Sequence, residues 1–279
     1  MIPQLSDSSV LRDFLDHHKI APSKSMGQNF LISEEVVESI LAVANEGPRL
    51  VTELGPGVGV LTQALIESGF EVQAIEKDDD FVKLLPSVVS PKNRGNLHVI
   101  HNDLKDVSWS HETEYQLIGN IPYNLSGYIF RILTQLEPAP TQAILLVQKE
   151  VGQRATAVPP DMSLLSLAIS LWGSAQKVLN VPPNCFWPQP DVHSQVLLLT
   201  PHTTPLLPIT EREAVMQFAR IFFQQKRKQL GSVMRKAFSL SAQETERIFK
   251  KCLISATARP EELTVAQWIN VTDQLSNLR

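Results

Sequence analysis

A glycine-rich turn and an acid that follows it carry the first chemical signal in the sequence. The turn contains Gly55 and Gly57 and comes directly after the apolar run 50–54, and Glu76 ends the next apolar run, 71–75. Glycines at such a turn allow the backbone to approach a bound cofactor closely, and the acid can accept hydrogen bonds from the hydroxyls of a ribose. The pair therefore predicts a nucleotide-like cofactor, and it fits both NAD and S-adenosylmethionine (SAM).

Asp103 holds a similar place after a third apolar run, 97–101. In SAM enzymes of this fold, an acid here accepts a hydrogen bond from the amino group of the adenine. An aspartate before Leu104 could instead cap a helix. Because Asp103 is the third polar residue in a series at strand ends, we interpret it as a cofactor ligand, and this favours SAM.

The tetrad Asn120-Ile121-Pro122-Tyr123 is the most informative motif. The lone pair of an exocyclic adenine amine is delocalised into the ring, so the amine is a poor nucleophile. The Asn120 side-chain oxygen and a backbone carbonyl of Ile121 or Pro122 can accept its two N–H bonds, which would make the nitrogen more pyramidal and aim its lone pair at a methyl donor. Pro122 restricts the direction of the carbonyl, and Tyr123 can stack against a flipped-out base. The tetrad predicts methylation of adenine.

The elements that must position these residues alternate between strand and helix patterns, which predicts a parallel sheet with helices on both faces. Ligands of such sheets bind beyond the carboxyl ends of the strands. Helices are expected at 60–65, 81–89 and 127–136, and Ser126 is expected to cap the last of these. The predicted strands are 50–54, 71–75, 97–101, 115–119 and 142–147.

Beyond the fifth strand, the alternation of strand and helix patterns gives way, after two further strands, to helical patterns alone. We expect a helix at 148–155, an apolar helical stretch at 163–172 and strands at 178–181 and 196–199. We place the catalytic domain at residues 1–200, with residues 1–33 contacting the cofactor. A proline- and threonine-rich linker follows at 201–208, and a helical RNA-binding domain at 209–279.

Charge is distributed unevenly along a chain whose formal net charge is only -4. Residues 1–200 carry 13 basic and 22 acidic residues, whereas residues 201–279 carry 12 and 7. The total excludes a uniformly basic nucleic-acid binder, but the asymmetry indicates a local basic surface. The stretch 220–236 has six basic residues and no acid, and we expect it to lie on a helix and to bind phosphates. The expected RNA contacts are Lys24, Lys149, Arg154, Arg220, Lys226, Arg227, Lys228 and Arg235.

The two cysteines, Cys185 and Cys252, exclude a disulfide framework and a four-cysteine zinc site. No secretory signal is evident, and the longest charge-free apolar run, 162–176, is too short to span a bilayer. We therefore expect a cytoplasmic protein, monomeric and without a membrane contact or a bound metal.

The chain resembles the rRNA adenine N6,N6-dimethyltransferases (the KsgA/RsmA family) over most of its length. The matching segments, in order, are SMGQNFL (25–31), ELGPGVGVLT (53–62), Glu76, Asp103, NIPYN (120–124), QKEVGQR (148–154), FWPQPDVHS (186–194), the basic stretch 226–228 and ARPEELTVAQW (258–268). Asp191 and His193 depart from the family pattern, which more typically has a basic residue and an aspartate there. The resemblance implies a Rossmann-like methyltransferase sheet and SAM-dependent dimethylation of two adjacent adenines in the 3′-terminal stem-loop of small-subunit rRNA, within an assembling small ribosomal subunit.

Roles for individual residues follow from the same resemblance. Asn29 and Leu31 would contact the cofactor, and Gly55 would lie against its methionine end. Asn120 would serve both the cofactor site and the target amine. Phe186, in Phe-x-Pro-x-Pro-x-Val-x-Ser, would stack on the target base together with Tyr123.

Other functions remain open at this point. The chain could methylate an adenine of large-subunit rRNA, or it could be a ribosome-assembly factor for which binding matters more than catalysis. An NAD dehydrogenase is the alternative at the level of the fold, but no catalytic His or Tyr-x-x-x-Lys pattern accompanies the glycine turn.

Overall fold

The computed structural model describes residues 4–22, 27–225 and 227–277, and the chain forms two compact units. The first unit comprises Met1–Gly152 and Gln176–Pro201, and the second comprises Gln153–Ala175 and His202–Arg279. The sequence-based division placed residues 153–175 in the first domain, whereas these residues group with the C-terminal helices. The last strand of the sheet ends at Pro201.

A seven-stranded sheet forms the centre of the first unit, with the strand order β4-β3-β2-β5-β6-β9-β7. Strands β4, β3, β2, β5 and β6 are parallel, and β9 runs antiparallel to β6. A second, two-stranded sheet joins β1 to β8. The strands are β1 (Phe30–Leu31), β2 (Leu50–Leu54), β3 (Glu71–Glu76), β4 (Leu97–His101), β5 (Gln116–Asn120), β6 (Gln142–Gln148), β7 (Gly173–Val181), β8 (Phe186–Trp187) and β9 (Ser194–Pro201).

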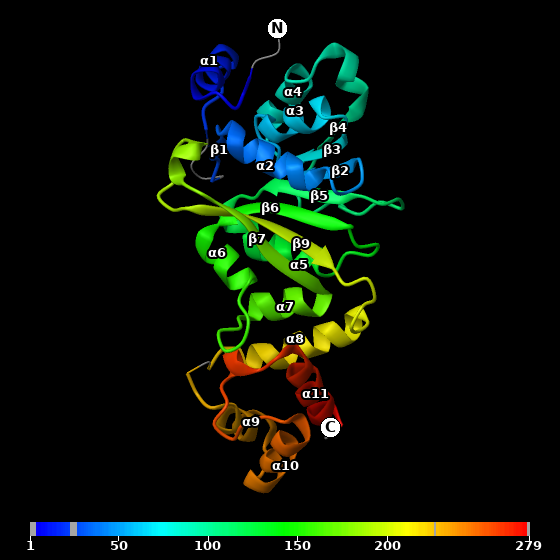
Figure 1. Ribbon diagram of the computed structural model, residues 1–279, viewed down its shortest axis with the longest axis vertical. Helices are drawn as coiled ribbons and strands as arrows, with labels where there is room; N and C mark the ends of the chain where they lie inside the picture. The colour runs from blue at the N-terminus through cyan, green and yellow to red at the C-terminus, as the bar shows by residue number, and fades with distance from the viewer. Residues whose placement is uncertain (1–3, 23–26, 226, 278–279) are drawn as a thin grey trace. The chain divides into compact units, whose positions relative to one another are not determined.

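The strands at the middle of the sheet are continuous apolar runs because helices cover both of their faces. Every residue of β6 up to Val147 is buried, and β5 is buried up to Gly119. Figure 1 shows α2, α3 and α4 on one face of the sheet and α5 on the other. The helices of this unit are α1 (Ser8–His18), α2 (Glu34–Ala44), α3 (Val60–Glu67), α4 (Asp79–Leu84), α5 (Ser126–Leu133) and the first residues of α6 (Lys149–Ala155).

The five parallel strands confirm the predicted Rossmann-like sheet, but Ser126 does not cap α5 as expected. A short 3-10 turn, η4 (Tyr123–Leu125), leads directly into the helix, and the residue at the cap position is Leu125, without a side-chain bond. The Ser126 hydroxyl instead donates to the Tyr123 carbonyl oxygen at 3.2 Å. Helix α4 is also shorter than predicted, and the chain continues as a 3-10 turn over Leu85–Ser87.

The second unit is helical and has its own apolar core. Phe222, Met234, Phe249 and Trp268 lie in this core, together with Leu167 from the segment that precedes the last strands of the sheet. The unit contains α7 (Leu164–Trp172), α8 (Ile209–Phe223), α9 (Leu230–Phe238), α10 (Ala242–Cys252), the 3-10 turn η6 (Pro260–Glu262) and α11 (Val265–Ser276).

The basic stretch was expected on one helix, and this expectation is wrong for its middle part. Helix α8 ends at Phe223 and α9 begins at Leu230, so Arg227 and Lys228 lie in the turn between the two helices. Lys24 and Lys226 lie outside the described residues.

None of the helices in the described part of the chain combines the length and the apolar character that crossing a membrane requires.

Candidate functional site

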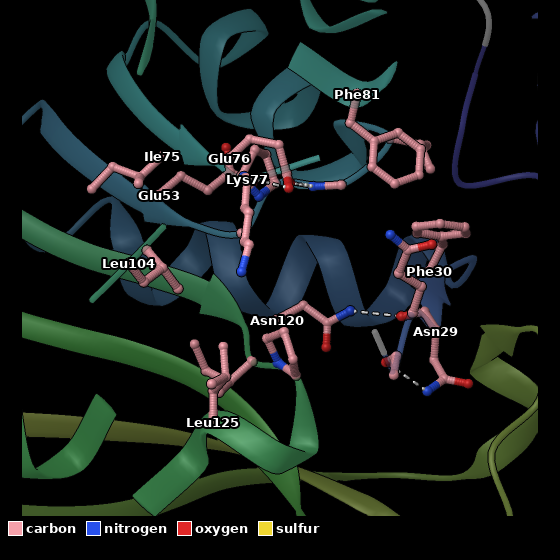
Figure 2. A pocket seen from close by; sticks show the side chains of 18 of the residues that line it. Asn29, Phe30, Glu53, Ile75, Glu76, Lys77, Phe81, Leu104, Asn120 and Leu125 are labelled. Carbon is pink, nitrogen blue, oxygen red and sulfur yellow. Dashed lines mark hydrogen bonds between the residues drawn. The ribbon is translucent and has the colours of Figure 1, made fainter. Parts of the chain in front are cut away.

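A pocket of about 300 Å³ opens at the carboxyl ends of β2, β3 and β5. Its volume is at the lower end of the range that is typical of small-molecule sites. Figure 2 shows side chains from the strand ends facing residues of the segment that leads into β1. Of the predicted site residues, the pocket is lined by Asn29, Leu31, Gly55, Gly57, Glu76, Asp103, Asn120, Pro122 and Tyr123.

The glycine turn between β2 and α3 needs glycine for conformation and for space. Gly55 and Gly57 have positive φ angles of 69° and 56°, a region that L side chains rarely adopt. A Cβ atom added to Gly57 would lie 3.2 Å from Cε1 of Phe30. At Gly55 and Gly57, therefore, no side chain stands between the backbone of the turn and the pocket.

Glu76 is held in place by three backbone donors. Its Oε2 accepts from the Gly57 N–H at 2.9 Å, and its Oε1 accepts from the N–H groups of Lys77 and Asp78 at 2.8 and 2.9 Å. Burial raises the pKa of the Glu76 carboxyl, and the three N–H bonds oppose that shift. The carboxylate is thus oriented at the end of β3 and joins two sides of the pocket.

Glu53, the fourth residue of β2, is a pocket residue to which sequence reasoning gave no role. Only 1% of it is exposed, and its Oε2 accepts a 2.6 Å hydrogen bond from the Thr62 hydroxyl. Burial raises the pKa of Glu53 to about 8. A glutamate inside the otherwise apolar run LVTEL was the available signal, since a buried acid in a strand requires a partner or a function.

Asp103 follows β4, the neighbour of β3 in the sheet, and a lysine reaches it. Lys77 Nζ contacts Asp103 Oδ2 at 2.8 Å, and the Lys105 N–H donates to Oδ1 at 3.0 Å. The hydrogen bond from Lys77 lowers the pKa of Asp103. In Figure 2 the Lys77 side chain extends away from Glu76, toward the side of the pocket on which Leu104 lies. Sequence reasoning assigned no role to Lys77.

The amide of Asn120 has one defined orientation. Its Nδ2 donates to the backbone carbonyl oxygen of Asn29 at 2.9 Å, as Figure 2 shows. Because a carbonyl oxygen can only accept, the nitrogen of the amide must face Asn29, and Oδ1 remains as an acceptor. The side chain of Asn29 is itself directed by a 3.2 Å bond from its Nδ2 to the Gly27 carbonyl.

Tyr123 is held at both ends. The phenol oxygen lies 3.1 Å from the hydroxyl of Ser194, and the Tyr123 carbonyl accepts the bond from Ser126. Burial raises the pKa of the Tyr123 phenol. The neighbouring Pro122 carbonyl accepts from the Leu125 N–H at 2.9 Å, which closes the turn after the tetrad.

Phe186 is not among the residues that line the pocket. It pairs with Leu31 through the β1–β8 ladder, and its side chain belongs to the apolar core, with 3% of the residue exposed. The structure thus brings Asn120, Pro122 and Tyr123 together at the pocket and places Phe186 in the apolar core.

The predicted RNA contacts that the structure describes are all exposed. Lys149 belongs to the first unit and Arg154 to the second, both in α6. Arg220 lies in the last turn of α8 and Arg235 in the last turn of α9, on either side of the turn that carries Arg227 and Lys228.

Comparison with known proteins finds similarity to ribosomal RNA methyltransferases over most of the chain. The family model described as "Ribosomal RNA adenine dimethylase" matches residues 21–277. A protein of Halothermothrix orenii named "Ribosomal RNA small subunit methyltransferase A" is 30% identical over 266 residues, which cover 90% of this chain and 87% of the relative. A protein of the same name from Clostridium acetobutylicum is 30% identical over 281 residues, covering 95% of this chain and 97% of the relative.

Solved structures have the same fold. A dimethyladenosine transferase from Plasmodium falciparum superposes with a TM-score of 0.73 at 21% identity, covering 87% of this chain and 95% of that one. The 23S rRNA methyltransferase ErmE gives a TM-score of 0.71 at 21% identity, covering 89% and 100%. With a family model that matches nearly the whole described chain, this protein belongs to the ribosomal RNA adenine dimethylase family.

Proposed function

We propose that the protein transfers methyl groups from SAM to the exocyclic N6 amines of two adjacent adenines in the 3′-terminal stem-loop of 16S rRNA. The observation that carries this proposal is the fixed amide of Asn120, whose Oδ1 is left as an acceptor at the pocket. The names of the relatives support a small-subunit substrate. The reaction would take place in an assembling small ribosomal subunit, and the protein would act in the cytoplasm.

The residues of the pocket fit SAM. Glu76 is oriented to accept from ribose hydroxyls, because three N–H groups hold its carboxylate at the end of β3. Asp103 would accept from the adenine amine, and Gly55 and Gly57 admit the methionine end close to the backbone. When bound, SAM supplies an electrophilic methyl group.

The target amine would be positioned by two acceptors at the end of β5. Asn120 Oδ1 is the first, since Asn29 holds the amide nitrogen. The Pro122 carbonyl already accepts from Leu125, which favours the Ile121 carbonyl as the second. These bonds localise the lone pair of the nitrogen and hold it in line for transfer, so the contribution of the protein is proximity and alignment. No side chain needs to remove a proton first, because the amine becomes acidic only after it has been methylated.

The ring of Tyr123 would form the stacking surface for the flipped-out adenine. Its place after Pro122 puts it at the lip of the pocket, next to the acceptors for the amine. Phe186 would join the stack if the base opened a path to its ring, which lies in the core behind β1.

Exposed basic residues would hold the RNA through its backbone. Structured RNA is recognised largely by shape and phosphate contacts, and the exposed arginines and lysines at the ends of α8 and α9 suit that mode. Lys149 and Arg154 would add contacts from α6. The predicted contacts Lys24 and Lys226 stay part of this proposal on sequence grounds.

One assay tests the proposal. The protein is incubated with SAM labelled in the methyl group and with small ribosomal subunits that lack the modification, and primer extension maps the modified positions. We expect label on two adjacent adenines near the 3′ end of the small-subunit rRNA. Label on large-subunit rRNA alone would contradict the proposed substrate. Binding to the particles without any transfer would contradict the proposed activity.

A further inference from the structure

Ser194 is a buried polar residue, and it comes directly after the loop 188–193 that joins β8 to β9. It is the first residue of β9, it pairs with Gln148 of β6, and none of it is exposed. A buried hydroxyl requires a hydrogen-bond partner, since leaving it unpaired costs free energy. The Ser194 hydroxyl has such a partner in the phenol of Tyr123, at 3.1 Å.

The phenol of Tyr123 is not needed for stacking, because every aromatic ring offers a face to a base. Its hydrogen-bond partner is a serine at the start of β9. Burial keeps the phenol protonated by raising its pKa, so the O–H remains available for a bond with Ser194. The bond between the Tyr123 hydroxyl and Ser194 therefore has a structural role: it holds the tyrosine in place.

We infer that Ser194 is a positioning residue, which holds the phenol end of the Tyr123 ring in one place and so sets the stacking surface for the target adenine before RNA binds. The ring is then held at its phenol end by β9 and at its backbone end by Ser126. A ring that is held in one orientation loses less entropy when a base docks on it. This hydrogen bond also joins the start of β9 to the tetrad at 120–123. This inference rests on the proposed function, because it concerns the base on which that function acts.

A double-mutant cycle tests the inference in the full-length protein. The variants are Ser194→Ala, Tyr123→Phe and the two combined. Methyl transfer to unmodified small subunits is measured as kcat and KM, and the affinity for SAM is measured by calorimetry. The matched control is Thr52→Val, which removes another fully buried hydroxyl from the same sheet at a residue that does not line the pocket.

Each single variant should lower kcat about five-fold, which corresponds to the loss of one hydrogen bond. The double variant should also lose about five-fold rather than about 25-fold, because both changes remove the same bond. The affinity for SAM should stay unchanged, and Thr52→Val should lower the unfolding temperature without lowering kcat. Additive losses in the double variant, or an unchanged kcat in Ser194→Ala, would overturn the inference. If the unaltered protein transfers no label to small subunits, the proposed function fails first.

Discussion

The orientation of Asn120 is the most specific feature of the site at the scale of single residues. The Asn29 carbonyl can pair only with a donor, so it selects the amide nitrogen and leaves the oxygen for the substrate. This position therefore requires asparagine, because the side chain must donate to the Asn29 carbonyl and still offer an acceptor to the substrate. Aspartate has the same shape but would set a carboxylate oxygen against the Asn29 carbonyl.

Asn120→Ala should lower the rate of methyl transfer by about a hundred-fold or more, the size of effect expected when a bond to the reacting group is lost. Asn120→Asp should be similarly impaired, although its volume is conserved. Single-turnover transfer to unmodified small subunits measures the rate, and calorimetry with SAM measures the remaining cofactor affinity, which should fall far less. Activity close to that of the unaltered protein in Asn120→Asp would contradict the amide orientation.

The ion pair between Lys77 and Asp103 has a consequence for the cofactor. The carboxylate that would accept the adenine amine already bonds to an ammonium group and to a backbone N–H. Lys77 has a largely exposed side chain, at 63%, so the pair is weak and sensitive to salt. Lys77 would therefore compete with the adenine of a bound SAM for Asp103.

Lys77→Met should tighten SAM binding up to about five-fold at low ionic strength, the upper range for an exposed ion pair. The advantage over the unaltered protein should shrink as salt is added, because salt already weakens the pair in the latter. Lys105→Met is the matched control, since it removes a nearby positive charge while the backbone N–H of residue 105 still bonds to Asp103. Equal effects of the two substitutions would assign the change to net charge rather than to the ion pair.

At the scale of elements, the strands of the sheet could be predicted well and the boundaries of the helices less well. Residues 50–54 and 97–101 were predicted with their observed bounds, because each is a short stretch rich in Leu, Val or Ile, although β2 is largely buried and β4, at the edge of the sheet, is not. The helix expected across the basic stretch is interrupted because residues 224–229 are all polar, and such a run offers no apolar face to bury. Helical propensity alone did not reveal this interruption.

The domain boundary was harder to predict, because it depends on contacts that are distant in sequence. Residues 153–175 stand between elements of the sheet along the chain, yet Leu167 and Leu171 lie in the apolar core of the second unit. No local pattern distinguishes an apolar helix that packs on a sheet from one that packs on other helices.

In the site, too, residues identified by local sequence could be predicted, and residues that depend on partners far away in the chain could not. The place of Glu76, Asp103 and Asn120 at the pocket could be predicted, because Glu76 and Asn120 end strands, Asp103 follows one, and strand ends meet at one edge of a parallel sheet. Lys77 and Ser194 could not, since their roles come from partners 26 and 71 residues away in the chain. Phe186 was assigned to the base from its motif, but the motif does not specify that its ring lies in the core.

Glu53, near the carboxyl end of β2, leads to a prediction of how the stability of the protein depends on pH. Burial raises the folded-state pKa of Glu53 to about 8 from an ordinary value of 4.5. An acid whose pKa is raised by folding contributes most stability below its unfolded pKa, and this contribution is lost as the pH rises through the folded pKa. Stability of the unaltered protein should therefore fall between about pH 5 and pH 8.5 relative to Glu53→Gln.

Glu53→Gln keeps an oxygen that can accept the bond from Thr62, so it isolates the ionisation from the contact. Urea unfolding at several pH values measures the difference in the free energy of unfolding between the two proteins. Glu71→Gln, at an exposed residue of β3, serves as the control for removing a carboxylate from the same sheet. A difference between Glu53→Gln and the unaltered protein that does not change with pH would show that Glu53 is ionised throughout this range.

At the scale of the whole molecule, the residues proposed for the cofactor and those proposed for RNA fall largely in different units. The acids that fit the cofactor, Glu76 and Asp103, belong to the first unit, while most of the exposed basic residues assigned to RNA belong to the second. A net charge of -4 therefore describes neither surface. This separation predicts that RNA affinity can be changed without changing the affinity for SAM.

Replacing Arg227, Lys228 and Arg235 with alanine should weaken RNA binding and reduce its dependence on salt, because each lost phosphate contact releases one fewer counterion. All three side chains are exposed, so the substitutions leave the apolar core of the second unit intact. The slope of log affinity for the rRNA stem-loop against log salt should become shallower by up to about three units, while calorimetry should give an unchanged affinity for SAM. Lys250→Ala with Lys251→Ala is the control in the same unit, because Glu246 lies 2.8 Å from Lys250 and Gln274 lies 3.0 Å from Lys251. A slope equal to that of the unaltered protein would mean that the basic residues of the turn and of α9 face solvent rather than RNA, and the contacts would then have to come from α6 and the remaining surface.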